Sequence, residues 1–162
     1  MVEKKIVIDN ITVGYSGLFR VTDFYKAIEA WIEKNNMEKE TKKKLHHVLK
    51  DGKKIEWLIE IWETPSDYAK RVVRLRALFN NVKDVSVNGK DMNNGDALIM
   101  IDGILETDIE GKWHQKPTHF FLRALYDKYF NKFYTNRFEG KLAADCYHIR
   151  DYIMEFFKAN RE

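Results

Sequence analysis

The chain has 162 residues, enough for one domain with a hydrophobic core, and a hydrophobic fraction of 44% excludes an intrinsically disordered protein. A net charge of +3 is too small to indicate nucleic-acid binding, and the single cysteine, Cys146, excludes a disulfide framework or a cysteine-cluster metal site. The chain has neither an apolar run long enough to span a membrane nor a signal-peptide core, so we expect a cytoplasmic protein. We also expect neither cofactors nor metals.

The N-terminal part predicts a strand followed by a helix. Apolar residues alternate over residues 5–15, as in a strand with one buried face. Thr22 or Asp23 is the expected N-cap of a helix that runs to about Asn35. The buried stripe of this helix is expected to consist of Phe24, Ile28, Trp31 and Ile32.

Residues 39–44, with the sequence Lys-Glu-Thr-Lys-Lys-Lys, form the basic cluster of the chain. Neither aromatic residues nor glycines are interleaved with the lysines. We interpret the cluster as a solvated connector or the entry to a strand. A patch that contacts phosphate groups is the alternative.

An antiparallel meander is predicted over residues 45–105. Its strands are expected at residues 45–50, 55–63, 68–79 and 97–105, with turns at residues 51–52, 64–67, 88–89 and 93–95. Asp51-Gly52 is a strong two-residue hairpin signal, and pairing across it places His46 opposite Trp57.

Side-chain parity divides this meander into an apolar face and a charged face. The apolar face is expected to carry Ile55, Trp57, Ile59, Ile61, Val73, Leu75, Ala77, Phe79, Ala97, Ile99, Ile101 and Leu105. The opposite face carries acidic, basic and acidic rows on successive strands, namely Glu56 and Glu60, Arg74 and Arg76, and Asp102 and Glu106. Each exposed cross-strand pair contributes only ~0.2–1 kcal/mol, so this ladder specifies register more than stability. The apolar face requires a helical cover.

The C-terminal part predicts two amphipathic helices. Between residues 117 and 134 aromatic and apolar residues recur in pairs every four positions: Phe121/Leu122, Leu125/Tyr126, Tyr129/Phe130 and Phe133/Tyr134. Pairs at this spacing give a helix one wide apolar face. A hairpin at residues 118–126 and 129–138 is the alternative. Gly140 is expected to separate the first helix from a last one over residues 141–158.

Together these elements predict a single α+β domain over residues 1–162, with an antiparallel sheet of five or six strands and three helices that cover one face. The order of a strand, a helix, an antiparallel meander and a long amphipathic C-terminal helix resembles the helix-grip fold of START and polyketide-cyclase-like proteins. The resemblance implies a curved sheet that wraps the terminal helix and leaves an apolar cavity between them.

A second resemblance covers roughly the last third of the chain. Its segments are Leu105-Glu106-Thr107-Asp108, Gly111-Lys112-Trp113, Phe121-Leu122-Arg123 and Phe138-Glu139-Gly140-Lys141-Leu142. They look like an uncharacterised family of small archaeal proteins. This likeness implies an archaeal cytoplasmic origin, and no activity comes with it.

Five residues are the expected ligand contacts: His46, Trp57, Phe121, Tyr126 and Tyr129. Histidine on the covered face is a candidate ligand contact or general base, and the aromatics can line an apolar cavity with phenol hydroxyls as polar handles. Each has a structural alternative. The aromatics then form the core between sheet and helices, and the histidine lies partly exposed near a sheet edge.

The remaining chemical groups have a structural interpretation. Asp102, Glu106 and Asp108 share parity and form an acidic strip, for which Arg74 and Arg76 are ready partners. Cys146 belongs to the buried stripe of the last helix and is expected to be part of the core.

From these patterns we predict a non-enzymatic protein that binds an apolar or aromatic small molecule between the sheet and the helices at residues 117–158. The alternative is an interaction or assembly protein that docks on RNA, ribosomes or a protein through its aromatic helix or its lysine-rich cluster. An enzyme that uses His46 is the third hypothesis.

Overall fold

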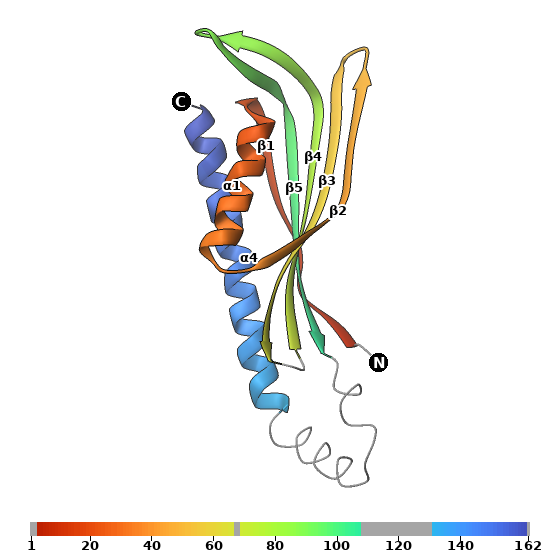
Figure 1. Ribbon diagram of the computed structural model, residues 1–162, viewed down its shortest axis with the longest axis vertical. Coiled ribbons are helices and arrows are strands. Elements are labelled where there is room, and N and C mark those ends of the chain that lie inside the picture. Colours follow the sequence, from red (N-terminus) through yellow and green to blue (C-terminus); the bar gives the residue numbers. More distant parts are fainter. Residues whose placement is uncertain (1–2, 67–68, 108–130, 162) are drawn as a thin grey trace.

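Five antiparallel strands form one continuous sheet in the computed structural model, which describes residues 3–66, 69–107 and 131–161 (Figure 1). The strands are β1 (Glu3–Phe19), β2 (Glu38–Leu49), β3 (Gly52–Ser66), β4 (Ala69–Val87) and β5 (Lys90–Thr107). Their order in the sheet is β1-β5-β4-β3-β2, so β1 and β2 are the two edges. The predicted strand at residues 45–50 is confirmed but begins earlier, at Glu38, so the lysine cluster at residues 39–44 is part of β2.

Two helices lie on the same face of this sheet, α1 (Val21–Lys34) and α4 (Asn131–Arg161) (Figure 1). The expectation of three helices on one face is wrong, because the part of the chain that the structure describes contains these two. The structure is mostly an open sheet, so the predicted fold class, a helix-grip-like sheet with three helices over one face, is wrong. The expected helix at residues 117–134 falls outside the described residues up to residue 130.

The predicted helix boundary at Gly140 is also wrong, since α4 continues through this glycine. A glycine inside a helix costs about 1 kcal/mol relative to alanine, which is too little to end a helix that packs on a sheet. Gly140 lies on the exposed side, and no atom approaches within 4 Å of the position that a Cβ would occupy. Packing of the flanking turns therefore overrides the local signal.

Alternation along the strands builds the hydrophobic core as predicted. All twelve residues assigned to the apolar face from parity are buried against the helices, and we call this face the inner face. The predicted stripe of α1 is buried as well. The stripe of α4 consists of Leu142, Cys146, Ile149, Ile153 and Phe157, spaced at three or four residues.

The two helices are joined to each other and to the sheet by polar contacts. Trp31 on α1 donates its indole N–H to Nδ1 of His148 on α4, at 3.0 Å. The expected N-cap side chains, Thr22 or Asp23, do not cap α1. Instead, the backbone N–H of Val21, the first residue of α1, donates a hydrogen bond to Oδ1 of Asn93 on β5, at 3.0 Å. A side chain from a distant strand therefore caps the helix.

The outer face of the sheet carries no helix among the described residues, and its charge ladder is confirmed in part, since Arg76 lies opposite Leu58 and Met100 instead of acidic residues. Arg74 donates to Glu60 at 3.1 Å and lies opposite Asp102 in the register of β4 and β5. Lys4 on the edge strand β1 pairs with Glu106 at 3.5 Å. The pairs at Arg74 and Glu106 therefore favour the observed strand register.

Two turn assignments are corrected. Residues 93–95 lie inside β5, where the extra residues of a bulge in β4 bring Val82 close to Gly95. The β2–β3 turn consists of Lys50 and Asp51, one residue earlier than expected, and Gly52 opens β3 with φ +138°.

α4 approaches the sheet closely at Gly103 of β5. A Cβ built there would lie 2.8 Å from Sγ of Cys146 and 3.3 Å from Cγ of Leu142. Only a residue without a side chain lets this turn of the helix pack at the observed distance from the strand.

We expect Gly103→Ala to lower the free energy of unfolding by about 1–3 kcal/mol, because the added methyl group overpacks a filled core. Denaturant titration of Gly103→Ala, Cys146→Ala and the double variant measures the coupling. The double variant should lose less stability than the sum of the single losses, since removal of Sγ relieves the clash. Strictly additive losses would contradict this packing. Gly140→Ala is the matched control and should stabilise the protein by about 1 kcal/mol.

Candidate functional site

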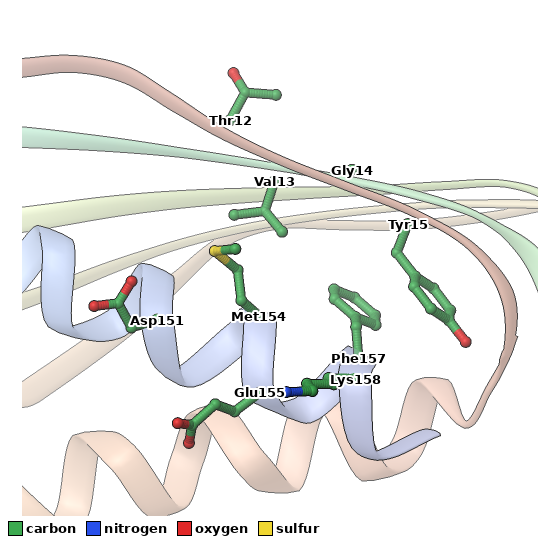
Figure 2. A pocket seen from close by; sticks show the side chains of 9 residues that line it. All are labelled: Thr12, Val13, Gly14, Tyr15, Asp151, Met154, Glu155, Phe157 and Lys158. Carbon is green, nitrogen blue, oxygen red and sulfur yellow. The ribbon is translucent and has the colours of Figure 1, made fainter. Parts of the chain in front are cut away.

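A groove runs between the edge strand β1 and the C-terminal turns of α4, with a volume of about 710 Å³ (Figure 2). It is lined by Thr12, Val13, Gly14, Tyr15, Asp151, Met154, Glu155, Phe157 and Lys158. The groove exists because β1 has no further strand beside it in the described part of the sheet, and α4 stands over that open edge.

The floor of the groove is a stacked pair of aromatic rings. The rings of Tyr15 and Phe157 lie 4.7 Å apart between centroids, with an interplanar angle of 12°. The phenol hydroxyl of Tyr15 donates to the carbonyl oxygen of Leu18 at 2.7 Å. Phe157 also packs edge-on against Phe19, so the core beneath holds both rings in place.

The walls combine apolar and charged side chains. Val13 on β1 and Met154 on α4 point toward each other across the groove (Figure 2). The Met154 side chain is 52% exposed, which makes it one of the most exposed large apolar groups of the described residues. Asp151, Glu155 and Lys158 supply charge at the rim, and Asp151 accepts a hydrogen bond from Arg150 at 2.9 Å. The groove can therefore hold an apolar molecule with a polar end.

Of the five predicted contacts, the structure describes two. His46 lies on β2 opposite Ile55, two positions from the expected partner Trp57, because the turn falls one residue earlier. All of β2 is exposed, so this histidine stands outside the core although its parity was correct. Trp57 is buried and packs edge-on against Phe24 and Tyr25 of α1.

His46 and Trp57 therefore lie near the opposite edge of the sheet from the groove. The other three predicted contacts, Phe121, Tyr126 and Tyr129, lie outside the described residues, so their role stays a prediction. Burial raises the pKa of the Tyr25 phenol, whose ring packs against Trp57.

Sequence reasoning missed the groove residues for an identifiable reason. Tyr15 was at the end of a predicted strand, and Met154 is off the apolar stripe of its helix. The exposed methionine one turn from Phe157 was the available signal, since an apolar residue on the polar side of an amphipathic helix is unusual.

The acidic residues have structural partners. Asp102 accepts a hydrogen bond from the backbone N–H of Asn10 at 2.7 Å. Ser16 and Asn81 donate hydrogen bonds to Asp96, which lowers the pKa of that carboxyl group. Among the residues that the structure describes, no group of three or more histidine, cysteine or acidic side chains is placed to hold a metal ion.

A buried carboxylate lies on α4 beside Cys146. Asp145 is 6% exposed, and its Oδ1 accepts a hydrogen bond from Lys141 at 2.5 Å. Lys141 also lies 3.8 Å from Glu63, which pairs with Arg71. These ion pairs join α4 to strands β3 and β4 at the edge of the hydrophobic core.

No protein-family model matches this chain, and no curated protein matches it. None of the described helices combines the length and the apolar character that a membrane span needs.

Cys146 is fully buried, and burial together with the nearby carboxylates of Asp145 and Asp102 raises the pKa of its thiol to about 12, from an ordinary value of 9.0. The folded protein holds the thiol proton more tightly than the unfolded chain does. This contribution to stability is therefore present below about pH 9 and is lost as the pH rises toward 12.

We expect alkylation of the native protein by iodoacetamide at about pH 8 to be far slower than alkylation in denaturant, since the thiolate is the reactive form. Cys146→Ala should also weaken the alkaline loss of stability between pH 9 and 12. Rapid stoichiometric labelling of the native protein would show that the thiol is accessible and contradict this assignment.

Proposed function

We propose that the protein is a non-enzymatic binder of an apolar or aromatic small molecule, and that the groove between β1 and α4 is its binding site. The observation that carries the proposal is the aromatic floor of a groove of about 710 Å³. Ligand sites in proteins have volumes of about 300–1,000 Å³ and are lined by apolar and aromatic groups with a few polar ones.

The chemistry of the lining selects the ligand class. Met154 adapts its shape to an apolar partner, since its side chain is unbranched and polarisable. The edge of the stacked pair of Tyr15 and Phe157 offers a flat apolar contact. Glu155 and Lys158 at the rim can each bind a polar group of the ligand that remains in water. We infer a flat, mainly apolar molecule with a polar end.

The cytoplasmic location, the archaeal origin and the participation of residues 121–129 in binding remain predictions. Docking on RNA, ribosomes or a protein stays the alternative prediction.

Nile red, a neutral apolar dye, is the probe for this groove. We expect the native protein to enhance and blue-shift its fluorescence independently of salt concentration. Met154→Asp should weaken dye binding about tenfold or more, because it places a charge on the apolar wall without touching the core.

Ala144→Asp is the matched control, since it introduces the same group at another exposed position of α4, away from the groove. It should leave dye binding unchanged. Equal binding by wild type and Met154→Asp would place the dye elsewhere and overturn the proposed site. Native mass spectrometry of freshly purified protein gives a second measurement, because a ligand that co-purifies with wild type should be absent from Met154→Asp.

A further inference from the structure

The positive charge of the chain is concentrated in one hairpin. We call residues 39–54, on β2 and the start of β3, the basic hairpin. It contains seven lysines and two acidic residues, a net charge of +5, whereas the whole chain carries +3. The remaining residues therefore sum to −2, and a small overall charge conceals a strongly basic element.

Several lysines of the basic hairpin are already paired, at its base and, in the case of Lys53, beside the turn. Lys39 contacts Glu29 at 2.7 Å, Lys43 contacts Glu56 at 3.3 Å, and Lys53 contacts Asp84 at 2.5 Å. Lys42 pairs with Glu40, and Lys44 stands over the Tyr25 ring. Within the described residues, Lys50 and Lys54 form no ion pair. These two lysines lie at the turn end of the hairpin, on either side of Asp51 and of the paired Lys53.

Apolar side chains occupy the same end. Val48 is 77% exposed and Leu49 is 60% exposed, immediately before the turn residues Lys50 and Asp51. Figure 1 shows this hairpin ending apart from the two helices. Exposure of two adjacent aliphatic side chains to water is unfavourable, and neither side chain belongs to the described hydrophobic core.

We propose that the end of the basic hairpin, residues 48–54, docks on an anionic lipid surface. Val48 and Leu49 enter the boundary between headgroups and acyl chains, while Lys50 and Lys54 remain at the level of the lipid phosphates. The combination of a small apolar wedge with adjacent lysines matches a surface that is anionic outside and apolar beneath. This inference is independent of the ligand groove, which lies at the other edge of the sheet.

A nucleic acid is the competing anionic partner, and the composition of the basic hairpin disfavours it. Proteins that bind single strands stack bases on aromatic side chains, and residues 39–54 contain no phenylalanine, tyrosine or tryptophan. A phosphate backbone would be contacted by the lysines, but it offers no apolar surface to Val48 and Leu49. The exposed aliphatic pair therefore decides in favour of lipid.

Co-sedimentation with vesicles tests the proposal on the full chain. One set of vesicles is phosphatidylcholine alone, and in the other about a third of the lipid is phosphatidylserine. We expect binding to the anionic vesicles, weaker binding at high salt, and little binding to the neutral ones. The charge variant Lys50→Glu/Lys54→Glu and the apolar variant Val48→Ser/Leu49→Ser should each weaken binding about tenfold or more.

Matched controls come from the opposite parts of the surface. Ile6→Ser replaces an apolar side chain that is 62% exposed on β1, and Lys26→Glu reverses an exposed charge on α1. Neither should change vesicle binding. All the substituted side chains lie outside the core, so circular dichroism and thermal unfolding should match the wild type and exclude misfolding.

Two outcomes would overturn the proposal. One is the absence of wild-type binding to anionic vesicles at low salt. The other is wild-type binding that survives the Val48→Ser/Leu49→Ser change, because attraction by charge alone would then explain it. Salt-sensitive binding to duplex RNA that responds to Lys50→Glu/Lys54→Glu and ignores the apolar variant, without vesicle binding, would identify the basic hairpin as a nucleic-acid arm. Dye binding in the groove should be the same for every variant.

Discussion

The architecture depends on how closely α4 approaches the inner face of the sheet. The helix places one apolar stripe along the strands, and Gly103 lets the turn that carries Cys146 come closer than any side chain would allow. An antiparallel sheet with one charged face can bury its other face only under such a cover. Because α4 packs over the edge strand β1, the same contact that completes the core also forms the groove at Tyr15 and Phe157.

Sequence periodicity predicted the sheet well and the helices less well. Alternation assigned Ile59, Leu75 and Ile101 to the buried face because a two-residue period leaves one choice of face, and a one-residue slip would have exposed all of them. Helix boundaries depend on tertiary contacts, which sequence does not display. Gly140 is a reasonable stop signal locally, yet packing on both sides carries α4 through it.

The groove was harder to predict than the fold because it is a property of separated segments. Val13 and Met154 are distant in the sequence and meet only after β1 has become an edge strand with α4 above it. Composition shows that aromatic side chains are abundant, but it does not show where packing between two elements leaves a groove. Trp57 was placed on the correct face, and close packing against α1 makes it part of the core. Parity identifies a face, whereas exposure depends on what covers it.

The lysines along the edge strand β2 have a structural role, which differs from the functional role proposed for the turn of the basic hairpin. Exposed strand edges invite pairing with other chains, and lysines along an edge prevent it. This accounts for Lys39 and Lys43, which also form ion pairs within the chain. It does not account for the exposed Val48 and Leu49. Aliphatic side chains at an edge favour pairing with other chains, whereas lysines disfavour it. Their position at the turn, beyond Lys39 and Lys43, fits a contact surface better than a protected edge.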